Sequence, residues 1–415
     1  MKFKFPDNFL WGAATSAHQV EGNNINDWSE WEKKNAKRLA EEAKTYWQSW
    51  QRKKFPEMLT PENYISGRAC DHYNRYEEDF NIARSLGHNA HRFSIEWSRI
   101  EPEEGKFNQR EIEHYQKVLE ALQKRNIKPF VTLWHFTNPL WLAKIGGLKN
   151  RKFPYYFTRY AKFAVSNLHD LADNWITLNE PTVVISNSFL KGKWPPQKKN
   201  CVSSFGLYSN FATAHKSAYE EIHKISDQIK VGLANMLIFL EPYRKNSILD
   251  RLSVSAFQYF SNKKMLNITK DYHDFLAVNF YFHNRTKFPA KIKNENKEVS
   301  DLGWEIYPEG IYHILKDLKK YNLPIYITEN GLANAEDEKR EKFIQDHLCW
   351  IHKAIQEGIN VKGYFHWSLL DNFEWDKGFW PRFGLVEVDY KTLERKIRPS
   401  AYEYAKICGG NGLEA

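Results

Sequence analysis

The sequence has few cysteines and no arrangement that would connect them. Only four occur among 415 residues, at Cys70, Cys201, Cys349 and Cys408, and none forms a CxxC pair. Disulfide frameworks and zinc sites need numerous or closely spaced ligands, and no HExxH motif is present either. The spacing therefore predicts reduced, mostly buried thiols and a protein without a metal or other cofactor.

Long apolar runs and a large excess of one charge are also missing. No uninterrupted apolar stretch reaches the ~18 residues that a membrane-spanning helix needs, and the N-terminal MKFKFPDNFLWG has no apolar core of the kind found in signal peptides. Sixty Lys and Arg against fifty-one Asp and Glu leave a net charge of +9, spread along the chain without a basic arm. We expect a cytoplasmic protein that binds neither nucleic acid nor membranes.

Aromatic residues, by contrast, are abundant. They make up 15% of the chain and include fifteen tryptophans. Most of these rings are expected to fill a large core, and a minority could line a sugar site, because aromatic faces pack well against C–H surfaces.

Eight short runs have the apolar, β-branched or aromatic character of buried strands. They lie at 8–14, 89–95, 129–135, 174–179, 230–236, 275–281, 324–329 and 361–368. Helical periodicity between them is clearest at 108–125, 155–171, 211–226, 310–320 and 338–358. This alternation predicts a single (β/α)8 barrel domain over 1–415. Two interruptions follow strands: a charged segment at about 23–68, expected as a helix and loop over one mouth, and a polar stretch at 283–303, expected as a mobile loop.

Two of the predicted strands end in a glutamate beside an asparagine. WITLNEP (175–181) ends at Glu180, and PIYITENG (324–331) carries Glu329. Barrel active sites lie where the strands end, and strands four and seven stand on roughly opposite sides of a barrel of eight. Other polar or aromatic side chains at or after strand ends are Gln19, Arg92, His135, Asn179, Asn279, Tyr281, Trp367, Glu374 and Trp375.

Facing carboxyl groups suggest cleavage of a glycosidic bond. That reaction needs one acid to protonate the leaving oxygen and one carboxylate facing the anomeric carbon. The pattern favours the same site for the supporting residues, with an alternative for each: Gln19, Asn279 and Trp367 could be satisfied core side chains, and His135 a core histidine or a metal ligand.

Five stretches resemble the signatures of glycoside hydrolase family 1, the retaining β-glucosidase family. They are FLWGAATSAHQVEG (9–22), HRFSIEWSRI (91–100), TLNEP (177–181), YITENG (326–331) and GYFHWSLLDNFEWDKGFWPRFGL (363–385). The similarity extends from residue 9 to about 402. It departs from the family between the fifth and sixth strands, where only residues 237–274 intervene.

The resemblance implies a role for each residue at the mouth. Glu180 matches the acid/base and Glu329 the nucleophile, which Arg92 and Tyr281 orient; Asn279 is assigned to the same orienting group. Ligands of the nonreducing sugar's hydroxyls are matched by Gln19, His135, Asn179, Glu374 and Trp375, and Trp367 matches the platform under that sugar. Glu180 needs a raised pKa to start protonated, while Arg92 is expected to lower the pKa of Glu329.

The resulting prediction is a retaining exo-β-glycosidase acting on small β-glucosides or short β-linked oligosaccharides through a covalent glycosyl-enzyme. Alternatives are a transglycosylating enzyme, a broad-specificity β-galactosidase or β-fucosidase of the same family, and a sugar-binding barrel without catalysis. The presence of a glutamate at position 374 favours unphosphorylated sugars as substrates.

Overall fold

The computed structural model describes residues 2–295 and 298–414, and its centre is a closed barrel of eight parallel strands. The strands follow one another around the ring as β6, β5, β4, β3, β2, β10, β9 and β7, and β7 pairs with β6 to close it. Their bounds are β2 (Leu10–Ala14), β3 (Ala90–Ser94), β4 (Lys128–Trp134), β5 (Asn174–Asn179), β6 (Lys230–Pro242), β7 (Leu276–Lys287), β9 (Ile325–Asn330) and β10 (Val361–Trp367). The predicted (β/α)8 barrel is thereby confirmed.

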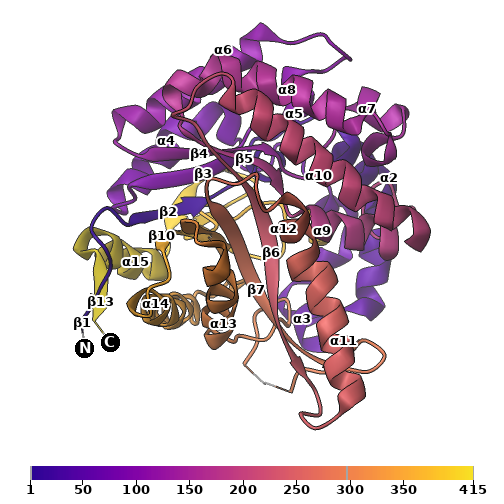
Figure 1. Ribbon diagram of the computed structural model, residues 1–415, viewed down its shortest axis with the longest axis vertical. Coiled ribbons are helices and arrows are strands. Elements are labelled where there is room, and N and C mark those ends of the chain that lie inside the picture. The colour runs from indigo at the N-terminus through magenta and orange to yellow at the C-terminus, as the bar shows by residue number, and fades with distance from the viewer. Residues whose placement is uncertain (1, 296–297, 415) are drawn as a thin grey trace.

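Helices surround the ring on its outside (Figure 1). Each of the five strongest helical patterns in the sequence forms one: α6 (Gln109–Lys124), α8 (Phe153–Leu168), α10 (Cys201–His223), α13 (Glu309–Leu318) and α14 (Arg340–Gln356). The other helices are α1 (Ala17–Val20), α2 (Asp27–Tyr46), α3 (Ser49–Lys54), α4 (His72–Ser85), α5 (Trp97–Ile100), α7 (Leu140–Lys144), α9 (Pro181–Val184), α11 (Ile248–Gln258), α12 (Lys264–Thr269) and α15 (Pro399–Gly410). Helices such as α6 bury one apolar stripe, which includes Ile112, Tyr115 and Leu119, against the strands.

The strands β6 and β7 are longer than the sequence pattern predicts. Their pairing continues beyond the barrel from Ile238↔Phe282 to Pro242↔Thr286, and a short strand β8 (Lys291–Ile292) pairs antiparallel with β7. Figure 1 shows β6 and β7 running together past the ring with α11 beside them. The prediction of a loop from residue 283 onward is therefore wrong for its first part. Polar residues such as Asn284 and Arg285 form strand there because β6 supplies a backbone partner.

The charged segment after β2 forms α2, α3 and two short 3-10 turns. Asn26 and Ser29 make a reciprocal capping box at the start of α2. The helix is charged on its outer side but buries Trp28 and Trp31 on the inner one. This inner face packs an aromatic layer against the mouth of the barrel.

The chain ends and the remaining short strands lie outside the ring. Strand β1 (Lys2–Lys4) pairs antiparallel with β13 (Gly412–Glu414), and β11 (Val386–Val388) pairs with β12 (Arg395–Ile397). Within residues 2–295 and 298–414, no helix is both long enough and apolar enough to cross a bilayer. Cys70 and Cys408 are buried free thiols and Cys349 is a half-buried one; the side chain of Cys201 lies outside the described part of the chain.

Candidate active site

Glu180 occupies a sharp corner between β5 and α9. Its backbone is left-handed, with φ of 46°, and its N–H donates to the carbonyl of Ala234 on the neighbouring strand at 2.8 Å. Pro181 then starts α9, where the fixed φ of proline suits the first helical position. A left-handed glutamate is strained, so the surrounding strands must hold it in place. The corner ends β5 and turns the carboxyl group into the cavity at the barrel mouth.

Glu329 lies near the end of β9 and is held by two donors. Arg92 of β3 donates from Nη1 to Oε1 at 2.5 Å, and the Tyr281 hydroxyl donates to Oε2 at 2.8 Å. Arg92 is almost fully buried, so its charge acts on Glu329 with little screening by water. Both carboxylate oxygens thus have a donor, and the group is fixed in orientation.

An amide pair connects the two glutamates. Asn279 Nδ2 donates to Glu180 Oε1 at 2.7 Å and to Asn179 Oδ1 at 3.1 Å, while Arg92 Nη2 donates to Asn179 Oδ1 at 2.6 Å. Thr328 donates to Asn279 Oδ1 at 2.7 Å, which fixes the orientation of that amide. Asn279, which the sequence assigns to the nucleophile, therefore makes its short contact with Glu180.

His135 follows β4 and presents a free donor. Asn179 Nδ2 donates to His135 Nε2 at 3.1 Å, and the other ring nitrogen, Nδ1, is buried without a protein partner. Burial and the charge of Arg92 hold the pKa of His135 well below its ordinary value, so the ring is neutral. With Nε2 accepting, the proton lies on Nδ1.

The mouth of the barrel holds a cavity of about 1130 Å³. Predicted site residues on its wall are His135, Asn179, Glu180, Tyr281, Glu329, Trp367, Glu374 and Trp375. Arg92, Asn279 and Gln19 lie behind that wall: the first two support the glutamates, and Gln19 Nε2 donates to Asn372 and to the Phe373 carbonyl at 2.9 and 2.8 Å. The fold thus brings all of the predicted residues to one end of the barrel.

The two carboxyl groups have different electrostatic surroundings. Burial, reinforced by the negative charge of Glu329, raises the pKa of Glu180 to about 8 against the opposing hydrogen bond from Asn279. Burial also raises the pKa of Glu329, contrary to the expected net lowering, although Arg92 and Tyr281 oppose that rise. Because the cation lies against Glu329, this residue ionises first and Glu180 retains its proton.

Indole rings enclose the end of the cavity near Glu374. Trp375 is stacked between two imidazoles, with ring centroids 5.5 Å from His18 and 5.9 Å from His135. His18 is anchored by Glu32 of α2 at 2.6 Å, so the inserted segment supports this wall from behind. Burial raises the pKa of Glu374 to about 8.

The sequence pattern did not single out several residues that complete the site. Trp304 and Trp194 line the cavity from loops with no strand-end signature, Phe136 lines it directly after His135, and Thr328 acts through Asn279. Thr328 directly precedes Glu329, so its place in YITENG was the available signal. Among residues 2–295 and 298–414, no group of three or more His, Cys, Asp or Glu side chains is arranged to hold a metal ion.

A barrel with two buried carboxyl groups at its mouth, one protonated and one paired with arginine, and with indole walls, has the features of a glycoside hydrolase. The model of Glycosyl hydrolase family 1 matches residues 1–270 and 247–413. Beta-glucosidase A of Thermotoga maritima is 34% identical over 99% of both chains, and a 6-phospho-beta-galactosidase of Staphylococcus epidermidis is 30% identical over 98% of both. The chain belongs to glycosyl hydrolase family 1.

Solved structures agree with this assignment. A beta-glycosidase from Pyrococcus horikoshii superimposes with a TM-score of 0.89 at 37% identity, covering 100% of this chain and 97% of the other. The beta-glucosidase from Thermotoga maritima in complex with glucoimidazole gives a TM-score of 0.88 at 33% identity, covering 99% and 100% of the two chains.

Proposed function

We propose that this protein is a retaining exo-β-glucosidase that releases β-D-glucosyl residues from the nonreducing ends of small β-glucosides or short β-linked oligosaccharides. The observation that carries the proposal is the division of labour in one cavity: Glu180 stays protonated, while Arg92 and Tyr281 hold Glu329 as a carboxylate. The relatives named beta-glucosidase support the choice of substrate.

In the first step, Glu329 attacks the anomeric carbon and Glu180 protonates the departing glycosidic oxygen. A bond forms between a Glu329 oxygen and the sugar while the bond to the leaving group breaks. Arg92 and Tyr281 orient the attacking carboxylate. Tyr281 can release the Glu329 carboxylate as bond formation neutralises the negative charge of that group.

In the second step, a water molecule displaces Glu329. Once Glu329 is esterified it carries no charge, so the negative charge that helped to raise the pKa of Glu180 disappears. Glu180 is then a carboxylate and takes the proton from the attacking water. Two inversions at the same carbon return the β-configuration.

The remaining wall residues are proposed to read the sugar. Trp367 supports the apolar face of the sugar, and the hydroxyl groups are bound by His135, Asn179, Glu374, Trp375 and Gln19. We place Glu374 at the C6 hydroxymethyl group. Gln19 donates toward Glu374 Oε2 at 3.4 Å and would reach the sugar from behind that carboxyl group.

Hydrolysis of 4-nitrophenyl β-D-glucoside followed by proton NMR tests the proposal. We expect β-glucose as the first product, with the α-anomer appearing only by mutarotation. First release of α-glucose would contradict retention, and absence of turnover with sugar binding intact would indicate a binding protein.

A panel of aryl glycosides tests the substrate. We expect the 6-phosphoglucoside to be cleaved poorly, since the Glu374 carboxyl group occupies the C6 edge and a phosphate dianion would have to be buried against it. Galactoside and fucoside should be cleaved to some extent, because the same hydroxyl ligands remain available. Better turnover of the phosphorylated sugar would contradict the assignment of Glu374.

A further inference from the structure

The segment that follows β10 carries cavity residues and a buried charge in close succession. Glu374 and Trp375 line the cavity. Asp371, three residues before Glu374, is fully buried and is not on the cavity wall. The proposed reaction gives this carboxyl group no task.

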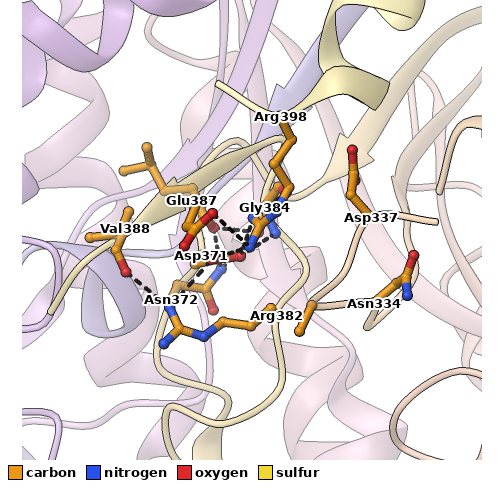
Figure 2. A network of polar contacts seen from close by, with 12 residues as sticks. Asn334, Asp337, Asp371, Asn372, Arg382, Gly384, Glu387, Val388 and Arg398 are labelled. Atoms are coloured by element: carbon orange, nitrogen blue, oxygen red, sulfur yellow. Dashed lines mark hydrogen bonds and ion pairs between the residues drawn. The ribbon is translucent and has the colours of Figure 1, made fainter. Parts of the chain in front are cut away.

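Two arginines and a backbone amide hold Asp371 (Figure 2). Arg398 donates to both carboxylate oxygens at 2.9 Å, which is the bidentate arrangement of a strong ion pair. Arg382 donates to Oδ2 at 3.3 Å, and the Gly384 N–H donates to Oδ1 at 2.9 Å. Burial alone would raise the pKa of Asp371, but the arginines outweigh it and hold the pKa below its usual value.

The same segment is bonded to Gln19 on its other side. The Gln19 side chain contacts Asn372 and the Phe373 carbonyl, as described above. In addition, the backbone carbonyl of Gln19 accepts a hydrogen bond from the Phe373 N–H at 3.2 Å. The side-chain amide of Gln19 also donates toward the Glu374 carboxyl group. The ion pair of Arg398 with Asp371, the backbone of residues 371–373 and the hydrogen bonds of Gln19 therefore connect Arg398, in front of α15, to a carboxyl group on the cavity wall.

We propose that Asp371 is a positioning residue for Glu374. Its ion pair with Arg398 fixes the backbone of residues 371–373, so that Gln19 can hold the Glu374 carboxyl at the C6 edge of the sugar. The inference rests on the proposed function, because it assumes that Glu374 reads C6. It differs from a general stabilising role, because it predicts that loss of Asp371 affects one part of the substrate.

The test compares two sugars in the Asp371→Asn variant. Asparagine keeps the shape of the side chain but removes its charge, leaving Arg398 without its carboxylate. For 4-nitrophenyl β-D-glucoside we expect kcat/KM to fall about tenfold or more, and for the β-D-xyloside, which lacks the hydroxymethyl group, we expect a fall of less than about threefold. Both substrates share every other ring hydroxyl, so the difference isolates the C6 contact.

Asp79→Asn is the matched control. Asp79 is equally buried and accepts from Arg395 at 2.9 Å and from His72 at 2.7 Å, but it lies in α4, outside the segment that carries Glu374 and Trp375. Its loss should lower thermal stability and change the activity on both sugars by the same factor. If Asp371→Asn does not fold, Arg398→Lys replaces it, because lysine keeps the cation but cannot pair bidentately. Its kcat/KM should also fall more for the glucoside than for the xyloside, by a smaller factor than in Asp371→Asn.

Two outcomes separate the inference from the function on which it rests. If folded wild-type protein cleaves the β-glucoside and Asp371→Asn loses equal factors on both sugars, the positioning role is refuted while the glucosidase assignment stands. If the wild-type protein does not cleave the β-glucoside, the proposed function fails first.

Discussion

At the scale of single residues, the environments of Glu180 and Glu329 determine their chemistry. Both are buried, yet only Glu329 has a guanidinium and a phenol within hydrogen-bond distance of its oxygens. Glu180 has a neutral amide as its side-chain partner. Arg92 and Tyr281 therefore favour the charged form of Glu329, whereas burial and the negative charge of Glu329 raise the pKa of Glu180.

Replacing Glu329 with alanine should lower kcat by at least about 10⁴-fold for every β-glycoside, because the nucleophile is lost in both steps. Measurement requires steady-state rates with an aryl glucoside and with cellobiose. Addition of azide should restore turnover of the aryl substrate by attack from the vacated side and yield the α-glucosyl azide. A loss below tenfold would show that another group attacks the sugar.

Replacing Glu180 with alanine should have an effect that depends on the leaving group. Alkyl glucosides need the proton and should react about 10²–10⁴-fold more slowly, whereas the first step with a dinitrophenyl glucoside should be nearly unchanged. Pre-steady-state measurement of phenol release separates the two steps. Equal losses for both leaving groups would contradict the role of Glu180 as acid.

The pH profile follows from the same two residues. With a pKa of about 8 in the free protein, Glu180 loses its proton above that pH, so kcat/KM for an alkyl glucoside should fall there. At acidic pH, kcat/KM should fall as Glu329 becomes protonated. The alkaline decline should be absent for a dinitrophenyl glucoside, and its persistence would assign the alkaline group elsewhere.

At the scale of elements, the ends of β9 and β10 approach so closely that only glycine fits between them. A Cβ at Gly331 would lie 1.9 Å from the carbonyl oxygen of Trp367. Glu329 lies near the end of β9 and Trp367 at the end of β10, so the spacing of these strands sets the distance between the two side chains.

We therefore expect Gly331→Ala to destabilise the protein by about 1–3 kcal/mol and to lower kcat at temperatures where it remains folded. Gly409→Ala is the control: it lies in α15 with no atom within 4 Å of the added Cβ, and it should stabilise by up to about 1 kcal/mol. Thermal unfolding monitored by circular dichroism measures both. A neutral Gly331→Ala would show that the strand ends can separate at little cost.

The sequence predicts well those elements that can be recognised from their own pattern of apolar and polar residues. β5 and β9 are short apolar runs with a polar end, so both the strands and their glutamates follow from the pattern. The extension of β7 past residue 283 could not be foreseen, because polar residues such as Asn284 become strand only when β6 is beside them. The same applies to the site: Glu180 and Glu329 are visible in sequence, but Thr328 and Trp304 act through contacts that only folding creates.

At the scale of the whole molecule, the buried acids make stability depend on pH. Burial raises the pKa of Asp27 to about 7 and those of Glu180 and Glu374 to about 8. Unfolded carboxyl groups titrate near pH 4, so between about pH 4 and pH 8 these three groups bind more protons in the folded state than in the unfolded state. Their contribution to the free energy of unfolding therefore falls as pH rises through this interval, by up to about 1.4 kcal/mol per pH unit and group. Buried histidines with lowered pKa, such as His88 and His135, act in the opposite direction up to about pH 6.5.

The contribution of Glu374 can be isolated from the change in the melting temperature of the sugar-free protein between pH 5.5 and pH 8. Glu374→Gln removes one group whose contribution to stability falls with rising pH, so its melting temperature at pH 8 relative to pH 5.5 should be higher than that of the wild type. Glu103→Gln, whose side chain is 68% exposed, should respond to pH as the wild type does. Scanning calorimetry at the two pH values makes the comparison, and an unchanged response in Glu374→Gln would mean that the Glu374 carboxyl group is ionised at little cost.

The pairing of β1 with β13 has a practical consequence. This pairing places the two ends of the chain side by side (Figure 1). Strand β1 leads into the start of β2, whereas the cavity lies where the parallel strands end, so the paired ends lie away from the substrate entrance. A purification handle or surface tether attached at either end would leave the entrance open to bulky glycosides. A short peptide could also join the two ends, so that new ends could be opened in an outer turn without disturbing the eight-stranded ring.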